Sequence, residues 1–238
     1  CFLEGDNSKI LPTDTLKNTA YSLAKNSTAE CIEEFAKEFI DFLLSRNPQV
    51  SAAEVSISDK AWEHLQSEGR PHPTTFVQAS GEIQTTSVKR TRSCDFSVTS
   101  GFENLVLMKT ANSAFEGYIQ DSLTTLPPAK DRLLGTALRA SWNYSHSNVD
   151  FNVLRSKVHE ILLQEFAGHN SKSVQHTLYA MGKAVLEEVA DVDDIELAMP
   201  NKHCLLVDLS HFGQDNPNEI FVPVDEPHGN IRARLRRQ

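Results

Sequence analysis

The sequence predicts an α+β fold in which helices pack on one face of antiparallel sheets. Long stretches alternate between apolar and polar residues, which is typical of strands with one exposed face, and two pairs of amphipathic helices interrupt them. The second half has the order strand, strand, helix, helix, strand, strand. The first half has the same order, but its opening pair of strands is almost absent. We therefore expect two related domains, residues 1–92 and residues 93–238.

The first half should begin with two helices. Thr13 or Asp14 can cap a short helix that continues to Ala24. A second helix should follow Ser27 or Thr28 and end near Asn47-Pro48, because its apolar residues recur every three or four positions up to that point. These apolar residues are Ile32, Phe35, Phe39 and Leu43.

Strands should follow the two helices. Alternation over 50–65 and 74–92 predicts two long strands, and Gly69 to Pro73 should form the loop between them. A third strand is expected over 93–109.

The second half continues with a short helix near 129–134 and a strand through Trp142. Two helices with apolar stripes should come next, the first from Phe151 and the second from Val174. The final strands should span 196–210 and 219–236, joined by the polar loop 211–218.

Composition excludes several classes of protein. The net charge of -9 argues against a general nucleic-acid surface, and the basic clusters at 89–92 and 232–237 are better explained as solvated strand charges or subunit contacts. Apolar runs reach only four or five residues, too few for a membrane span.

Cysteine and histidine spacing offers no cofactor or metal motif. The 4 cysteines lack a C-x-x-C pair, and the 9 histidines lack H-E-x-x-H spacing, so free thiols and no locally assembled metal site are expected. There is also no glycine-rich nucleotide fingerprint and no haem attachment pattern.

A few residues could carry chemistry, although each has an ordinary structural explanation. Phe115 follows a strand into a loop and is either a projected ring or a core aromatic. Arg132, placed at the start of the expected short helix, is either a ligand clamp or a surface charge. Ser173-Val174-Gln175 begins the last helix, where free N–H groups can meet an anion. Asn201 with His203, and Thr13 with Asp14, could simply cap or solvate the backbone.

Together these residues suit a flat, polar, anionic heterocycle. An aromatic face can stack on such a ring, while a guanidinium and an amide can bond its edge. Small polar groups could then handle protons.

The segments that contain these residues resemble the urate oxidase family in the same order along the chain. They are LPTDTLKNT at 11–19, LMKTANSAFEG at 107–117, SVQ at 173–175, MPNKH at 199–203 and IFVPVDEPHGN at 220–230. This resemblance implies two tunnelling-fold domains in each chain, assembled as a homotetramer with active sites between subunits. It also implies an oxidase without metal, flavin or other cofactor, which converts urate, dioxygen and water to 5-hydroxyisourate and hydrogen peroxide.

The resemblance also assigns roles to individual residues. Phe115 would stack on urate, Arg132 and Gln175 would grip its edge, and the backbone of Val174 would touch it. The neighbouring chain would supply Thr13 and Asp14. Asn201 would hold dioxygen or water above the ring, and His203 would join Thr13 in a proton relay.

At its ends the sequence departs from the family pattern. The family opens with two strands, one of which carries a lysine that supports the threonine, and no counterpart precedes residue 11 here. We therefore expect an incomplete first sheet and weak or no activity from this polypeptide alone. The ending Leu235-Arg-Arg-Gln238 lacks a peroxisomal Ser-Lys-Leu address, which favours a bacterial cytoplasm over a peroxisome.

Two alternatives remain open at this stage. One is another tunnelling-fold enzyme that acts on pterins or GTP, which would require zinc ligands and a glutamate anchor. The other is a scaffold that keeps the purine pocket without catalysis.

Overall fold

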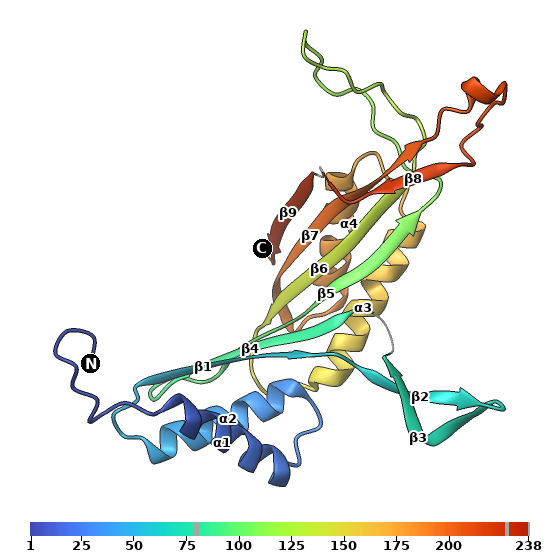
Figure 1. Ribbon diagram of the computed structural model, residues 1–238. Coiled ribbons are helices and arrows are strands. Elements are labelled where there is room, and N and C mark those ends of the chain that lie inside the picture. Colours follow the sequence, from blue (N-terminus) through green and yellow to red (C-terminus); the bar gives the residue numbers. More distant parts are fainter. Residues whose placement is uncertain (79–80, 227–228, 238) are drawn as a thin grey trace.

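A computed structural model describes residues 1–78, 81–226 and 229–237. Its centre is one antiparallel sheet of 7 strands in the order β1-β4-β5-β6-β7, after which β7 pairs with both β8 and β9. Figure 1 shows this sheet running through the whole molecule. Its strands are β1 (Ala52–Asp59), β4 (Ile83–Thr91), β5 (Ser97–Lys109), β6 (Leu134–Tyr144), β7 (Val192–Leu206), β8 (Phe221–Val224) and β9 (Asn230–Arg236).

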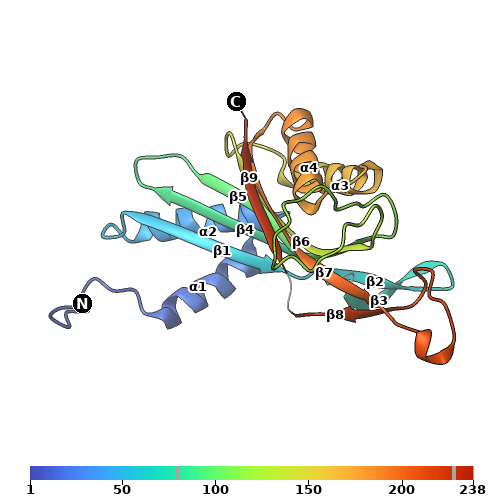
Figure 2. The ribbon, with the colours of Figure 1, turned by 90° about the horizontal axis from the view of Figure 1, so that it is seen from above.

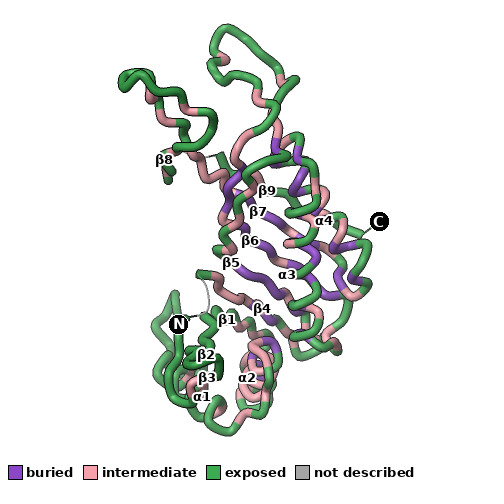
Figure 3. Tube along the Cα trace, turned by 90° about the vertical axis from the view of Figure 1, so that its right-hand side faces the viewer, coloured by how far each residue is buried: buried purple, intermediate pink, exposed green. Residues whose placement is uncertain are grey.

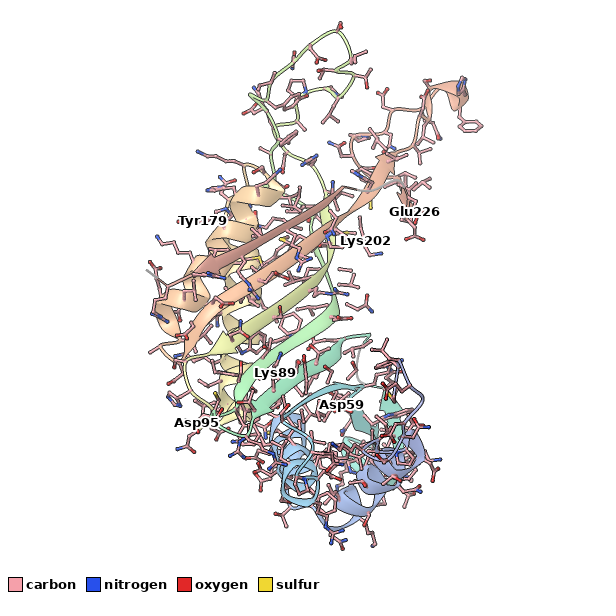
Figure 4. The ribbon with its side chains drawn as sticks, turned by 90° about the vertical axis from the view of Figure 1, so that its left-hand side faces the viewer. Asp59, Lys89, Asp95, Tyr179, Lys202 and Glu226 are labelled. Atoms are coloured by element: carbon pink, nitrogen blue, oxygen red, sulfur yellow. The ribbon has the colours of Figure 1, made fainter. Side chains whose placement is uncertain are left out.

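Three helices cover one face of the sheet, as the α+β prediction requires. They are α2 (Ile32–Arg46), which packs on β1 and β4, with α3 (Phe151–Gly168) and α4 (Val174–Glu188), which pack on the later strands (Figures 2 and 3). Alternate residues of β7 on this face, among them Ile195, Leu197 and Met199, are fully buried. The other face carries the polar residues (Figure 4), where Lys89 of β4 pairs with Glu54.

The helix α1 (Thr13–Asn26) differs from the other three because it has no buried residue. Its position agrees with the prediction, but its cap does not. Thr13 is already helical, the cap position falls on Pro12, and no side chain bonds the first turn there. Asp14 instead accepts from Asn18 Nδ2 at 2.9 Å and pairs with Lys17.

The prediction of a loop at 69–73 is wrong. It lies within a separate hairpin of β2 (Trp62–Ser67) and β3 (Arg70–Gln78), so the strand predicted over 50–65 is also divided in two. Glu68 and Gly69 both adopt positive φ, which makes the tight turn, and the prolines of β3 are tolerated because each strand of a two-stranded ribbon is an edge.

The prediction of a short helix at 129–134 is also wrong, so Arg132 does not begin a helix. Ala129 bridges to Phe115, and the Arg132 N–H donates to the Ser113 carbonyl at 2.8 Å. Pro127 and Pro128 disfavour helical backbone just before this point. The chain therefore runs extended into β6. The final strand predicted over 219–236 is likewise interrupted, because β7 pairs with β8 and β9 along different parts of its length.

A buried ion pair joins α2, α3 and β5. Arg155 of α3 donates to the Glu33 carboxylate of α2 and, at 2.7 Å, to the Gly101 carbonyl of β5. Ser100 Oγ also donates to Glu33, which is fully buried. None of the helices in the described ranges is long and apolar enough to cross a membrane.

Candidate active site

The segment that carries Phe115 is held on both sides by backbone hydrogen bonds. On one side Ala114 N–H donates to the Ser171 carbonyl at 2.7 Å, just before α4. On the other side Phe115 exchanges two bonds with Ala129, at 2.7 and 2.9 Å. This short ladder brings the start of α4 and the approach to β6 to opposite sides of Phe115, although the three segments lie far apart in sequence.

Arg132 lies at the aromatic ring. Its guanidinium carbon is 5.0 Å from the centroid of Phe115, a favourable arrangement of a cation over a π face. Asp131 supports the arrangement by accepting from the Ser113 N–H at 3.0 Å.

One polar atom of Arg132 has no partner. The Nε atom is buried and has no hydrogen-bond partner among the residues that the structure describes. Burial lowers the pKa of the guanidinium, a shift that Tyr118 opposes, but an arginine remains charged at neutral pH. A buried, unpaired donor of this kind is costly, so an acceptor on a ligand would stabilise it. Four other buried side-chain atoms also have no partner among the described residues, but they lie in the core: Glu33 Oε2, Thr136 Oγ1, Trp142 Nε1 and Tyr144 Oη.

Tyr118 is a residue that the sequence reasoning missed. Its ring stacks on Phe115 with centroids 4.8 Å apart and planes 15° apart, and its hydroxyl donates to the Leu126 carbonyl. The hydroxyl contact holds Tyr118 in place, and the stacking contact orients the Phe115 ring. The spacing Phe-x-x-Tyr at 115–118 was the available signal.

A pocket of about 410 Å³ brings Arg132 together with Asn201 and His203. Asn201 and His203 are two positions apart along β7, so their side chains share one face of the strand. Asn201 pairs with Thr136 of β6, and His203 pairs with Val224 of β8. Asn201 Nδ2 lies 3.4 Å from His203 Nδ1. Asn218 also lines this pocket and was not anticipated from the sequence.

The start of α4 lies beside the ladder, as its pairing with Ser171 requires. Ser173 Oγ caps the helix by accepting from the His176 N–H at 3.1 Å, and Val174 is buried. Gln175 is exposed and lines a different groove, of about 760 Å³, between α4 and β9. Tyr179, labelled on α4 in Figure 4, lines the same groove. Gln175 follows Ser171, which bonds to the ladder, by a few residues, but it does not line the pocket of Arg132.

Thr13 and Asp14 are not brought to this pocket within one chain. Figures 1 and 3 show α1 at one end of the molecule and the 110–133 loop at the other. Both side chains are exposed.

Comparison with known proteins decides the family. The family model described as uricase matches residues 2–89 and 98–232. The chain belongs to the uricase family. The uricase of Danio rerio is 35% identical across 100% of this chain and 81% of its own length. The uricase of Arabidopsis thaliana is 40% identical across 98% of this chain and 81% of its own.

Solved uricase structures agree with the fold. The crystal structure of the uricase from Arthrobacter globiformis superposes with a TM-score of 0.94 at 34% identity, and covers 100% of this chain and 80% of that one. The urate oxidase of Bacillus sp. TB-90, with a TM-score of 0.86 at 20% identity, shares the fold. The predicted α+β tunnelling fold is therefore confirmed, and membership of the uricase family decides against the pterin and GTP alternative.

Proposed function

We propose that the chain oxidises urate with dioxygen and water to 5-hydroxyisourate and hydrogen peroxide, without a cofactor. The observation that carries this proposal is the unpaired Arg132 Nε beside the Phe115 ring, at a pocket that Asn201 and His203 also line. Family membership supplies the substrate.

Phe115 and Arg132 form the binding half of the proposed site. The Phe115 ring would stack on urate, which requires the Tyr118 ring or the Arg132 guanidinium to move off the face that it covers. The guanidinium would offer parallel donors to the carbonyl and ring nitrogen along one edge of urate. Val174 would contribute a free backbone N–H in the first turn of α4. Gln175 would read the opposite edge, which requires its exposed side chain to turn from the α4–β9 groove toward Phe115.

Asn201 and His203 form the half that handles dioxygen and protons. A deprotonated urate is electron-rich and can give two electrons to dioxygen directly, while two protons complete hydrogen peroxide and water adds to the oxidised ring. The protein then needs only to hold the anion, place dioxygen or water and move protons. Asn201 is suited to the placing, and His203, 3.4 Å away, to the proton transfer.

A second copy of the chain would complete the site. Thr13 and Asp14 lie exposed at the start of α1, far from Phe115 in their own chain (Figure 1), so a neighbour is the natural source of both. In this proposal, Thr13 joins His203 in the proton relay. A homotetramer with sites between subunits provides such neighbours, and residues 1–92 and 93–238 are the two tunnelling-fold domains of each subunit.

The test follows urate through its ultraviolet absorbance, together with dioxygen uptake and peroxide release. Whatever its rate, each urate that wild type consumes should be matched by one dioxygen taken up and one peroxide released. Arg132→Ala should lose this turnover, whereas Arg139→Ala should keep it, because Arg139 is an exposed arginine of β6 that pairs with Glu103 of β5. Equal turnover by the two variants would refute the assignment of Arg132, and tight binding of an inert xanthine without peroxide would favour the non-catalytic scaffold.

A further inference from the structure

A chain of buried hydroxyl groups holds the start of α4 beside the segment that carries Phe115. Ser171 lies in the connector between α3 and α4, and Thr177 is the fourth residue of α4. Thr177 Oγ1 donates to Ser171 Oγ at 2.7 Å, and Ser171 Oγ donates in turn to the Ser173 carbonyl at 3.1 Å. The Thr177 N–H donates to the same carbonyl at 3.1 Å, so the three residues close a small ring of hydrogen bonds.

Ser171 is hydrogen-bonded through every polar group that it has. Its N–H donates to the Asn112 carbonyl at 2.9 Å, and its carbonyl accepts from the Ala114 N–H at 2.7 Å. Its hydroxyl both accepts and donates within the ring. Because Ala114 directly precedes Phe115, Ser171 connects the proposed stacking residue with the first turn of α4.

The burial of these hydroxyls indicates that they specify geometry. Ser171 is 0% exposed and Thr177 is 1% exposed. A buried hydroxyl costs free energy unless it is hydrogen-bonded, and its bonds then add little net stability compared with an apolar side chain. A buried network whose members are all bonded does, however, hold them in one arrangement. We therefore expect the network to fix where α4 begins more than to stabilise the fold.

The corresponding junction in the first half of the chain lacks these hydroxyls. The connectors 27–31 and 169–173 are equally long, and α2 and α4 both contain 15 residues. Ala29 occupies the connector position that Ser171 has in the second half, and Phe35 occupies the helix position of Thr177. No side chain among the described residues caps α2 either. A helix can therefore start at this place in the fold without the network, which is found at the junction assigned to urate.

From these contacts we propose that Ser171 and Thr177 are positioning residues for urate binding. They hold the first turn of α4, with Val174 and Gln175, at a fixed place beside the Phe115 ring. With the backbone held, Gln175 can reach the ligand by rotation of its own side chain. The inference rests on the proposed function, because it assigns the α4 turn to urate. Neither Ser171 nor Thr177 touches the substrate.

The test measures the dissociation constant of an inert xanthine analogue by calorimetry for two replacements of Thr177. Thr177→Val keeps the shape of the side chain but removes the donor, so the analogue should bind about fivefold more weakly. Thr177→Ser keeps the donor but removes a buried methyl group, so it should bind as wild type does although its fold is less stable. In turnover, Thr177→Val should raise KM by a similar factor with little change in kcat.

Thr86→Val is the matched control. Thr86 is also a buried threonine whose hydroxyl donates to a carbonyl, that of Thr99 at 3.0 Å, but it lies on β4 in the first half of the chain. The urea unfolding midpoint of Thr86→Val should shift about as much as that of Thr177→Val, since each loses one buried hydrogen bond. The affinity of Thr86→Val for the analogue should equal that of wild type.

A further pair of variants tests the bond itself. Ser171→Ala removes the acceptor of the Thr177 hydroxyl, so Ser171→Ala and Ser171→Ala/Thr177→Val should bind the analogue equally weakly. Additive losses in the double variant, equal affinities of Thr177→Val and Thr177→Ser, or a weakened Thr86→Val would overturn the positioning role and leave the proposed function intact. Failure of wild type to bind the analogue would overturn the proposed function, and this inference with it.

Discussion

Two arginines that are at least half-buried, Arg155 and Arg132, differ in how their side chains are hydrogen-bonded. Arg155 is 8% exposed, and it donates to Glu33 and to the Gly101 carbonyl. Arg132 is half-buried, and its Nε donor has no partner among the described residues. Because a buried, unpaired donor is costly, the pairing of Arg155 favours a structural role and the unpaired Nε of Arg132 favours a ligand-binding role.

The largest effect should follow from breaking the structural pair. Arg155→Met leaves the Glu33 carboxylate buried without its cation, so the free energy of unfolding in urea should fall by about 3–5 kcal/mol. Arg139→Met, at an exposed ion pair, should cost less than about 1 kcal/mol. If the two variants lose equal stability, the Arg155–Glu33 ion pair does not stabilise the contact between α2 and α3. The double variant Glu33→Met/Arg155→Met should recover most of the loss.

Removal of Arg132 should weaken ligand binding without lowering the stability of the fold. Arg132→Ala deletes charged hydrogen bonds to the ligand, so an inert xanthine should bind about 2–3 kcal/mol more weakly in calorimetry. The free energy of unfolding should hold or rise, because the variant no longer buries an unpaired donor. A large loss of stability with unchanged affinity would place Arg132 in the same class as Arg155.

Truncation of the stacking ring should have a smaller effect on binding. Phe115→Leu keeps an apolar side chain but removes the aromatic face, so the xanthine should bind about 1–2 kcal/mol more weakly. Tyr118→Leu should weaken binding less, because Tyr118 only supports the ring. The same titrations measure both variants, and a greater loss at Tyr118 would assign the stacking role to that residue.

The smallest effect concerns His159 on α3. A hydrogen bond to Glu82 raises the pKa of His159, against a smaller opposing effect of burial. Its stabilisation should therefore be complete below about pH 6.5 and disappear as the pH rises through the raised pKa. Unfolding of wild type and His159→Gln should differ by less than about 1 kcal/mol in acid and converge in alkali. A difference that grows with pH would contradict this sign.

Periodicity predicted most of the fold because apolar spacing reports directly on burial. The stripes of α2, α3 and α4 and the alternation of β4 to β7 were all visible in the sequence. The prediction failed at 129–134, where the backbone is committed to Ser113 and Phe115, far away in sequence. It failed again at Glu68-Gly69, where a two-residue turn was hidden in what looked like a longer loop.

The candidate site could be predicted only in part. The resemblance to urate oxidases pointed to Arg132, Asn201 and His203, which do line one pocket, but neither spacing nor composition could show that Arg132 Nε lacks a partner. Tyr118 was missed because its role depends on how the loop folds back onto Phe115. Thr13 was expected from another chain, and a single sequence carries no geometry between chains.

The most direct test of the account is a crystal structure of the protein with an inert xanthine analogue. The account predicts the analogue stacked on Phe115, an acceptor atom within about 3.2 Å of Arg132 Nε, and Thr13 of a second copy at the far edge of the ring. An analogue bound elsewhere, for example in the groove between α4 and β9, with Arg132 Nε still unpaired, would contradict it.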